Sequence, residues 1–166
     1  MGTEQRPIAV FDLDGTLSDT RHRLHHLARR PKDWGAFFRT APHDPPLAAG
    51  VELALRWARE CEIGYVTGRP ERCRGDTERW LAGHGLPAGE LWMRGGGDRR
   101  PAKVAKLELL RQVAATRTVA VVVDDDAQVC AAYRAAGFPV VEADWMPAPG
   151  ADRETLHHAQ EEEGRT

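Results

Sequence analysis

The sequence predicts an α/β domain built on a parallel sheet of about five strands, with helices on both faces of the sheet. The first observation is that short apolar runs alternate along the chain with amphipathic stretches of helical length. The second is that the runs at 8–11, 63–66 and 119–123 are continuously apolar. Such runs are typical of strands that are covered on both faces. The length of 166 residues favours one domain, 1–166, with a core of its own.

The strands follow from the apolar runs, and the helices between them follow from the spacing of apolar residues. Two further, weaker strands are predicted at 91–93 and 140–141. Helices are predicted from about 51 to 60, from 77 to 83, from Pro101 onward and from 127 to 136. Pro101 suits the first turn of a helix, and Gly137 suits a left-handed C-terminal cap. One or two additional helices are expected in 21–40, within an insertion of about 20–45, and the tail of about 150–166 is expected to be solvated.

Composition excludes several classes of protein. Hydrophobic residues make up 42% of the chain and charged residues 29%, with a net charge of -2, so the protein is expected to be soluble and ordered. The sequence contains no apolar run of membrane-spanning length, and the residues before Asp12 do not resemble a signal peptide, which favours a cytoplasmic location. Three widely separated cysteines make neither a disulfide framework nor a zinc site.

Acidic residues follow two of the predicted strands. Asp12 and Asp14 come directly after the first strand, and Asp124, Asp125 and Asp126 come after the fourth. Adjacent carboxylates repel one another and need a cation or hydrogen-bond donors to coexist. Asp126 has a structural explanation as the N-cap of the next helix. The others predict a Mg²⁺ site at the carboxyl end of the sheet, because oxygen ligands suit this ion.

Four motifs together resemble those of the haloacid dehalogenase superfamily of phosphohydrolases. They are Asp-Leu-Asp-Gly-Thr at 12–16, Val-Thr-Gly-Arg at 66–69, a lysine before the fourth strand, and Val-Asp-Asp at 123–125. The resemblance covers about 8–145 and implies a Rossmann-like domain with a minimal helical cap. Within the superfamily, the segments 94–100, 104–106 and 123–129 are most similar to the phosphatase domain of bacteriophage-type polynucleotide kinase–phosphatase. Asp126 departs from that pattern, which has a basic residue there, and no kinase phosphate-binding loop occurs in the chain.

The resemblance implies catalytic roles for four residues. Asp12 would be the nucleophile that forms an aspartyl-phosphate, and Asp14 would be the general acid and then the general base. Thr67 would donate hydrogen bonds to the phosphate oxygens. Lys106 would neutralise negative charge at the phosphoryl group. The competing candidate, Lys103, is more simply interpreted as a surface residue.

The resemblance also implies a metal site and substrate contacts. Mg²⁺ would be held by the carboxylates of Asp12 and Asp124 and by the backbone carbonyl of Asp14, with Asp125 orienting bound water or a basic neighbour. The expected substrate-binding residues are Gly68, Arg69 and Arg94. For Arg69 and Arg94, the alternative to a contact with substrate is an ion pair at the protein surface.

The predicted function is Mg²⁺-dependent hydrolysis of a phosphomonoester through an aspartyl-phosphate, with a nucleotide or polynucleotide 3′-phosphate as the favoured substrate. The alternatives are a phosphatase of a small cytosolic metabolite and a catalytically silent binding or regulatory domain. The oligomeric state stays open. A second open point is the role of the basic segment 21–32 and of the aromatic residues Trp34, Phe37 and Phe38. These residues either contact nucleic acid or pack as a cap.

Overall fold

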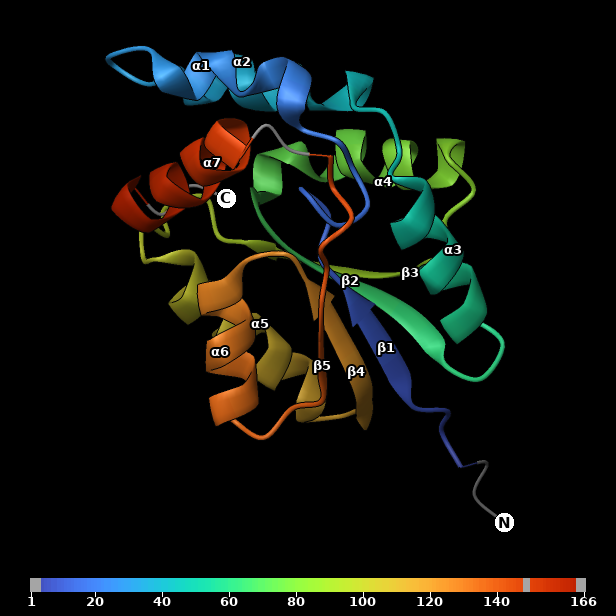
Figure 1. Ribbon diagram of the computed structural model, residues 1–166. Coiled ribbons are helices and arrows are strands. Elements are labelled where there is room, and N and C mark those ends of the chain that lie inside the picture. Colours follow the sequence, from blue (N-terminus) through green and yellow to red (C-terminus); the bar gives the residue numbers. More distant parts are fainter. Residues whose placement is uncertain (1–3, 148–149, 164–166) are drawn as a thin grey trace.

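The computed structural model describes residues 4–147 and 150–163, and five parallel strands form its sheet (Figure 1). The spatial order is β3-β2-β1-β4-β5. The strands are β1 (Ile8–Phe11), β2 (Glu62–Pro70), β3 (Gly89–Arg94), β4 (Val119–Asp124) and β5 (Val140–Glu142). The predicted parallel sheet is therefore confirmed. β2 is longer than its apolar run because its end still pairs with β3, across an irregularity between Thr67 and Pro70.

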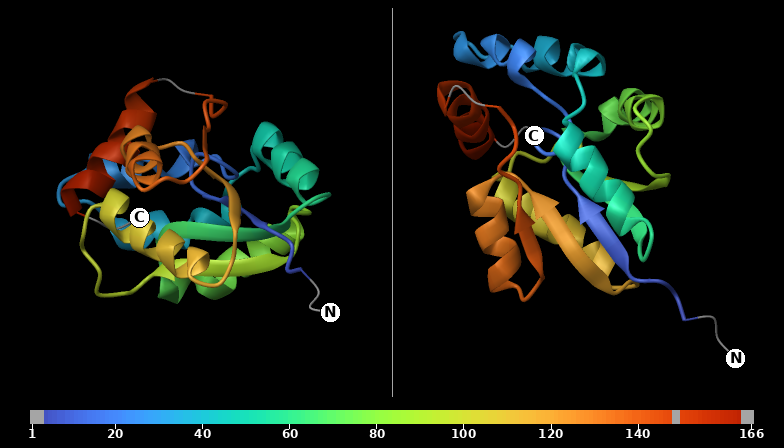
Figure 2. Two further views of the ribbon diagram at one scale, coloured as in Figure 1. Left: turned by 90° about the horizontal axis from the view of Figure 1, so that it is seen from below. Right: turned by 45° about the vertical axis from the view of Figure 1, so that its right-hand side comes forward.

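Two pairs of helices cover the two faces of the sheet, as the continuously apolar strands predicted (Figure 2). Helices α3 (Ala48–Trp57) and α4 (Arg74–Gly83) lie on one face, and α5 (Ala102–Ala114) and α6 (Ala127–Ala135) on the other. Side chains of a strand alternate between the faces. In β1, Ala9 and Phe11 accordingly join one apolar cluster, while Ile8 and Val10 join the other.

Short-range signals set the bounds of α6. The side chain of Asp126 accepts hydrogen bonds from the backbone N–H groups of Gln128 and Val129, which is the N-cap arrangement. Gly137 follows the helix with φ of +90°, a conformation that glycine adopts without steric cost. Both ends agree with the prediction from the sequence.

A small cap lies beyond the carboxyl end of the sheet (Figure 1). It consists of η1 (Arg21–Arg23), α1 (His25–Ala28), α2 (Trp34–Arg39) and η2 (Ala41–His43). The aromatic residues of α2 are buried and pack with Leu24 and Leu27. Of the two interpretations of these aromatic residues, the structure therefore supports cap packing, because buried rings offer no face to a base.

The expectation of a solvated tail at about 150–166 is wrong for 150–163, and 164–166 lie outside the described residues. Residues Gly150–Glu163 form helix α7, which lies beside the cap in both views of Figure 2. Leu156 and Ala159 are buried in the same apolar cluster as the cap residues. The acidic run at 161–163 suggested solvation, but tertiary contacts give these charges basic partners. Within the described residues, no helix is long and apolar enough to cross a membrane.

Candidate active site

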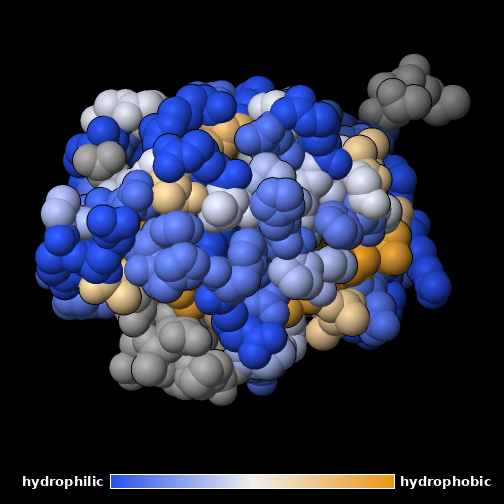
Figure 3. Space-filling view, turned by 90° about the horizontal axis from the view of Figure 1, so that it is seen from above, coloured by the Kyte–Doolittle hydropathy of each residue, from blue (hydrophilic) through white to orange (hydrophobic). Residues whose placement is uncertain are grey.

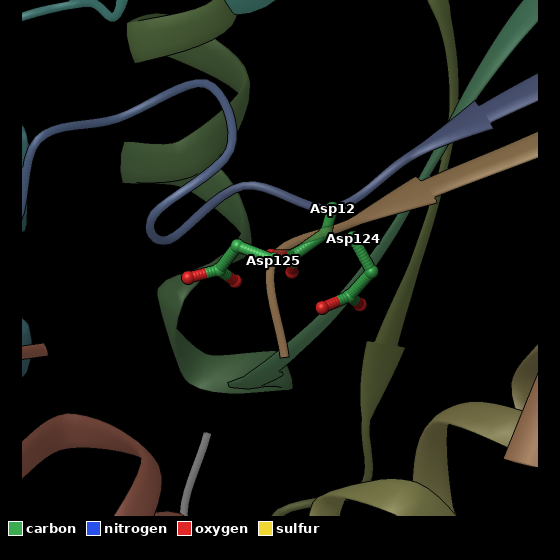
Figure 4. Close-up of side chains that lie close together, drawn as sticks. All are labelled: Asp12, Asp124 and Asp125. Atoms are coloured by element: carbon green, nitrogen blue, oxygen red, sulfur yellow. The ribbon is translucent and has the colours of Figure 1, made fainter. Parts of the chain in front are cut away.

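The two acidic motifs meet where β1 and β4 lie side by side. Phe11 is in register with Val123, so Asp12 and Asp124 leave neighbouring strands at the same edge of the sheet. The backbone N–H of Asp12 donates to the carbonyl of Val123 at 2.9 Å. One carboxylate oxygen from each of Asp12, Asp124 and Asp125 lies within 4.8 Å of the others (Figure 4). A crevice beside adjacent strands of this kind is the usual ligand position in open α/β sheets.

Lys106, a residue of α5, bridges the carboxylates at the ends of β1 and β4. Its Nζ lies 2.8 Å from Asp12 Oδ1 and 2.8 Å from Asp124 Oδ2, and its side chain is buried. Burial alone would lower the pKa of Lys106, but Asp12 and Asp124 outweigh it and raise that pKa, so the amine stays charged. Lys103 lies one turn earlier and points to Gln128 and Glu161 outside the cluster. Of the two lysines, Lys106 is thus the one that lies within the acidic cluster.

The acidic cluster has the character of a divalent-cation site. Burial raises the pKa of Asp12, and the neighbouring Asp124 raises it further against the opposing effect of Lys106. Burial likewise raises the pKa of Asp124 to about 6. One lysine does not compensate three buried carboxylates, and their oxygens are the ligands that Mg²⁺ prefers. The donor set therefore fits the ion that the sequence predicted.

A tight turn brings Asp125 against the loop that follows β1. Gly15 has φ of +87°, and a Cβ built on it would lie 2.2 Å from Asp125 Oδ2. Only glycine permits both this backbone conformation and this approach. The next residue, Thr16, donates its hydroxyl to Asp12 Oδ2 at 3.1 Å. With Lys106 on Oδ1, both oxygens of Asp12 are held in fixed positions.

Asp14 points away from the acidic cluster and contacts two buried arginines. Its Oδ1 lies 2.5 Å from Arg69 Nη2 and 2.7 Å from Arg23 Nη2, and it also accepts the hydroxyl of Ser18 at 3.1 Å. Burial would raise the pKa of Asp14, but Arg69 and then Arg23 outweigh it and hold that pKa well below its usual range. In this conformation Asp14 is ionised.

Arg23 and Asp44 belong to this site, although the sequence analysis assigned neither to it. Arg23 Nε lies 2.8 Å from Asp44 Oδ1, its Nη2 lies 2.7 Å from Asp44 Oδ2, and its guanidinium also stacks on the Phe37 ring at 4.1 Å. The sequence placed Arg23 among the basic residues of segment 21–32 with an open role. Its pairing with an acid 21 residues away follows no helical or strand spacing, so no local pattern reveals it.

The Thr67–Arg69 segment, at the end of β2, borders the site next to Asp14. The backbone N–H of Arg69 donates to Thr67 Oγ1 at 3.1 Å, and this hydroxyl can still donate its own hydrogen. Arg94, from the end of β3, donates to the carbonyl of Gly68 at 3.1 Å and to that of Arg100 at 2.6 Å. Arg94 also forms an ion pair with Asp98 at 3.8 Å, but its side chain is buried, so it supports the backbone of the segment from the interior and not from the surface. Its predicted contact with substrate stays a prediction.

His157 of α7 reaches the site from the end of the chain. Its Nε2 lies 3.1 Å from Asp125 Oδ2. Burial lowers the pKa of His157, but the hydrogen bond and charge of Asp125 outweigh this and raise it. His157 was not predicted from the sequence, because the tail was expected to be solvated and nothing in the pattern of residues 150–163 connects this histidine to the acidic motifs.

Comparison with known proteins identifies a family for most of the chain. The family model described as the polynucleotide kinase PNKP phosphatase domain matches residues 6–145. A structure of the Pnkp1/Rnl/Hen1 RNA repair complex contains a similar chain, with 24% identity, a TM-score of 0.70 and coverage of 89% of this chain and 47% of that one. A second structure of the Pnkp1/Rnl/Hen1 complex gives 25% identity, a TM-score of 0.69 and coverage of 89% and 49%. The chain thus spans about half the length of these relatives.

More distant structures share the fold over about nine tenths of their length. A haloacid dehalogenase-like hydrolase from Streptococcus pneumoniae has 13% identity and a TM-score of 0.61, with coverage of 93% of this chain and 91% of that one. The HAD-hydrolase YfnB from Bacillus subtilis, described as bound to magnesium, has 10% identity and a TM-score of 0.59, with coverage of 89% and 92%. No curated protein matches the sequence.

Proposed function

The chain belongs to the family of PNKP phosphatase domains within the haloacid dehalogenase superfamily, and for this phosphatase we propose a nucleotide or polynucleotide 3′-phosphate as the substrate. The match over residues 6–145 confirms the resemblance inferred from the motifs. The substrate proposal is supported by the description of that family. A further support is the similarity to a chain of an RNA repair complex, of which this chain covers about half.

The observation that carries the mechanism is the bridge of Lys106 between Asp12 and Asp124. We assign Asp12 as the nucleophile because both of its oxygens are held, one by Lys106 and one by Thr16. A carboxylate oxygen of Asp12 attacks phosphorus, the bond from phosphorus to the ester oxygen breaks, and an aspartyl-phosphate forms. Lys106 offsets the negative charge that accumulates on the nucleophile and the phosphoryl group.

Asp14 supplies and removes the proton in this proposal. It protonates the departing ester oxygen, and then takes a proton from the water that attacks phosphorus and releases inorganic phosphate from Asp12. While Asp14 contacts Arg23 and Arg69 it is ionised and cannot act as an acid. Proton donation therefore requires that its carboxylate leave the two arginines after substrate binds and take up a proton from solvent, and the phosphate dianion is a suitable replacement partner for Arg69.

Mg²⁺ would be held by Asp12 and Asp124, with Asp125 beside them and the backbone carbonyl of Asp14 as a further ligand. The ion would supply positive charge that lowers repulsion between Asp12 and the incoming phosphate. Thr67 and the Gly68 backbone, which Arg94 supports, are the proposed donors to the remaining phosphate oxygens.

A panel of substrates tests the proposal. We expect kcat/KM for a 3′-phosphorylated oligonucleotide and for a nucleoside 3′-monophosphate to exceed that for a nucleoside 5′-monophosphate and for sugar phosphates, with Mg²⁺ present. The Asp12→Asn variant serves as the blank for every substrate. If sugar or small-acid phosphates are preferred, the chain acts on a small metabolite and the nucleic-acid assignment is wrong. If no phosphomonoester is hydrolysed, including p-nitrophenyl phosphate, the catalytic proposal is wrong as well.

A further inference from the structure

The acidic end of α7 connects the cap to the body of the domain. Lys32 of the cap lies 2.6 Å from Glu162 and 3.3 Å from Glu163, measured from Nζ to carboxylate oxygens. Lys103 of α5 lies 3.2 Å from Glu161 in the same way. Three consecutive acids therefore bind two lysines that come from different parts of the fold. Residues 150–163 lie outside the family match, so this arrangement is not a feature of the matched region.

The same helix also contacts the cluster of carboxylates, at Asp125. His157 contacts Asp125, and both Asp12 and Asp125 expose only 3% of their surface. A phosphoryl group must touch Asp12 to react, so an element that covers the site has to move before a substrate is bound. Beyond the carboxyl end of the sheet, the cap contacts Asp14 through Arg23, and α7 contacts Asp125 through His157.

α7 is held more weakly than the cap. The Arg23 side chain is fully buried and bonds to two buried acids, Asp14 and Asp44. The acids of α7 that bind the lysines are 36–44% exposed, and the Lys103 side chain is 41% exposed, so the Lys103–Glu161 pair stabilises the protein little. The Lys32 side chain is only 5% exposed, and Glu163 also accepts a hydrogen bond from Trp34 Nε1, so this contact with the cap is the stronger one. Among residues 156–163, Leu156 and Ala159 add the apolar contacts of the helix. Of the two covers, α7 is the one that can be displaced at lower cost.

Lys32 lies in a hollow that brings basic and acidic side chains together. The hollow, of about 640 Å³, lies between the cap, the loop after β3 and the end of α7, and its lining residues include Lys32, Arg99, Asp33, Glu162 and Glu163. Seen from the cap side, the surface of the molecule is predominantly hydrophilic (Figure 3). Lys103 lies one helical turn from Lys106 in the active site. Phosphates of a polynucleotide and the carboxylates of α7 would compete for the same amines.

We propose that Lys32 and Lys103 bind backbone phosphates of the polynucleotide next to its reacting 3′ end, and that the acidic end of α7 occupies these lysines until the polynucleotide displaces it. The inference rests on the proposed polynucleotide substrate. It assigns the lysines as a binding surface and α7 as its competing occupant. If α7 were only a structural support, loosening it from either side would have the same effect on nucleic-acid binding.

Two sets of substitutions separate these possibilities, because each loosens α7 but only one removes the binding surface. The first is Glu161→Gln, Glu162→Gln and Glu163→Gln, and the second is Lys32→Gln with Lys103→Gln. The matched control for the first set is Glu52→Gln, Glu60→Gln and Glu90→Gln, which changes the net charge equally at exposed positions. The probe is a labelled single-stranded oligonucleotide that ends in a 3′-hydroxyl, and its Kd is measured by fluorescence anisotropy.

We expect the α7 variant to bind the oligonucleotide several-fold more tightly than the control variant, and the lysine variant to bind it more weakly than the unmodified protein. The slope of log Kd against log salt should fall by about 0.7 for each lysine–phosphate ion pair that the substitutions remove. In the unmodified protein, saturating oligonucleotide should accelerate amide hydrogen exchange in residues 156–163.

The inference is overturned if the Kd shifts in the same direction for both sets of variants, or if it shifts in neither. It is also overturned if the oligonucleotide leaves amide hydrogen exchange in α7 unchanged. An unmodified protein that does not bind the oligonucleotide would also overturn it. The proposed function is judged separately, by hydrolysis of nucleoside 3′-monophosphate. Suppose that this ester is cleaved and that the Kd for the oligonucleotide is the same in both sets of variants as in the unmodified protein. In that case only the role proposed for Lys32, Lys103 and α7 is wrong.

Discussion

Arg23 Nη2 lies 2.7 Å from Asp14 Oδ1, so the cap is tied to the proposed general acid by a buried ion pair. Arg23 also binds Asp44, and Arg69 approaches both acids, at 2.5 Å and 3.5 Å. Two arginines and two aspartates thus balance one another inside the protein. This arrangement links the stability of the cap to the ionisation of a residue that must change its partners during turnover.

Replacing Asp12 with Asn should abolish turnover while the fold is kept, because an amide does not attack phosphorus. We expect kcat for p-nitrophenyl phosphate to fall by about three orders of magnitude or more. Asp126→Asn is the matched control, since Asn also caps a helix and this position lies outside the proposed chemistry. Substantial residual turnover in the Asp12 variant would rule out the covalent route.

Replacing Asp14 with Asn should slow the reaction most for esters with poor leaving groups. An alkoxide needs a proton as it departs, whereas p-nitrophenolate needs little assistance. The measurement is the single-turnover rate of phosphorylation for an alkyl phosphate and for p-nitrophenyl phosphate. An equal loss for both esters would contradict the assignment of Asp14 as the acid.

Replacing Arg23 with Met should destabilise the protein by about 3–5 kcal/mol, because it removes a buried cation that pairs with two buried carboxylates, Asp14 and Asp44. Adding Asp44→Asn should cost less than the sum of the two single changes, since the second change removes one of the two carboxylates that lost this partner. Urea unfolding of the two single variants and the double variant measures the coupling. Arg29→Met is the control, because the Arg29–Asp33 pair is exposed and is expected to contribute less than about 1 kcal/mol. Simple additivity would mean that Arg23 and Asp44 do not depend on each other.

Mg²⁺ should bind more tightly as the pH rises through about 6. Burial raises the pKa of Asp124 to about 6, so below this pH the carboxyl is protonated and the ion must displace a proton. Above it, the carboxylate is ionised and the proton no longer competes. Mg²⁺ titrations followed by thermal unfolding at several pH values measure the affinity without requiring turnover. An affinity that does not change between about pH 5 and 7 would contradict Asp124 as a ligand.

Local patterns in the sequence are enough to specify the sheet and the central carboxylates. Strands covered on both faces leave continuously apolar runs, and acids that end such runs in neighbouring parallel strands must meet at one edge. The helix bearing Lys106 was predicted from its apolar stripe, and the four-motif pattern selected Lys106 over Lys103. These features can be predicted from the sequence because each depends on periodicity or on residues that are close together in the chain.

Long-range packing alone sets what surrounds Asp14 and what covers the site. Arg23 reaches Asp44 across 21 residues, and His157 reaches Asp125 across 32, without any repeat that relates them. The charged end of α7 has the composition of a solvated segment, yet it is paired with lysines of the cap and of α5. Ion pairs between distant residues depend on where whole elements pack, and local sequence patterns carry no information about that packing.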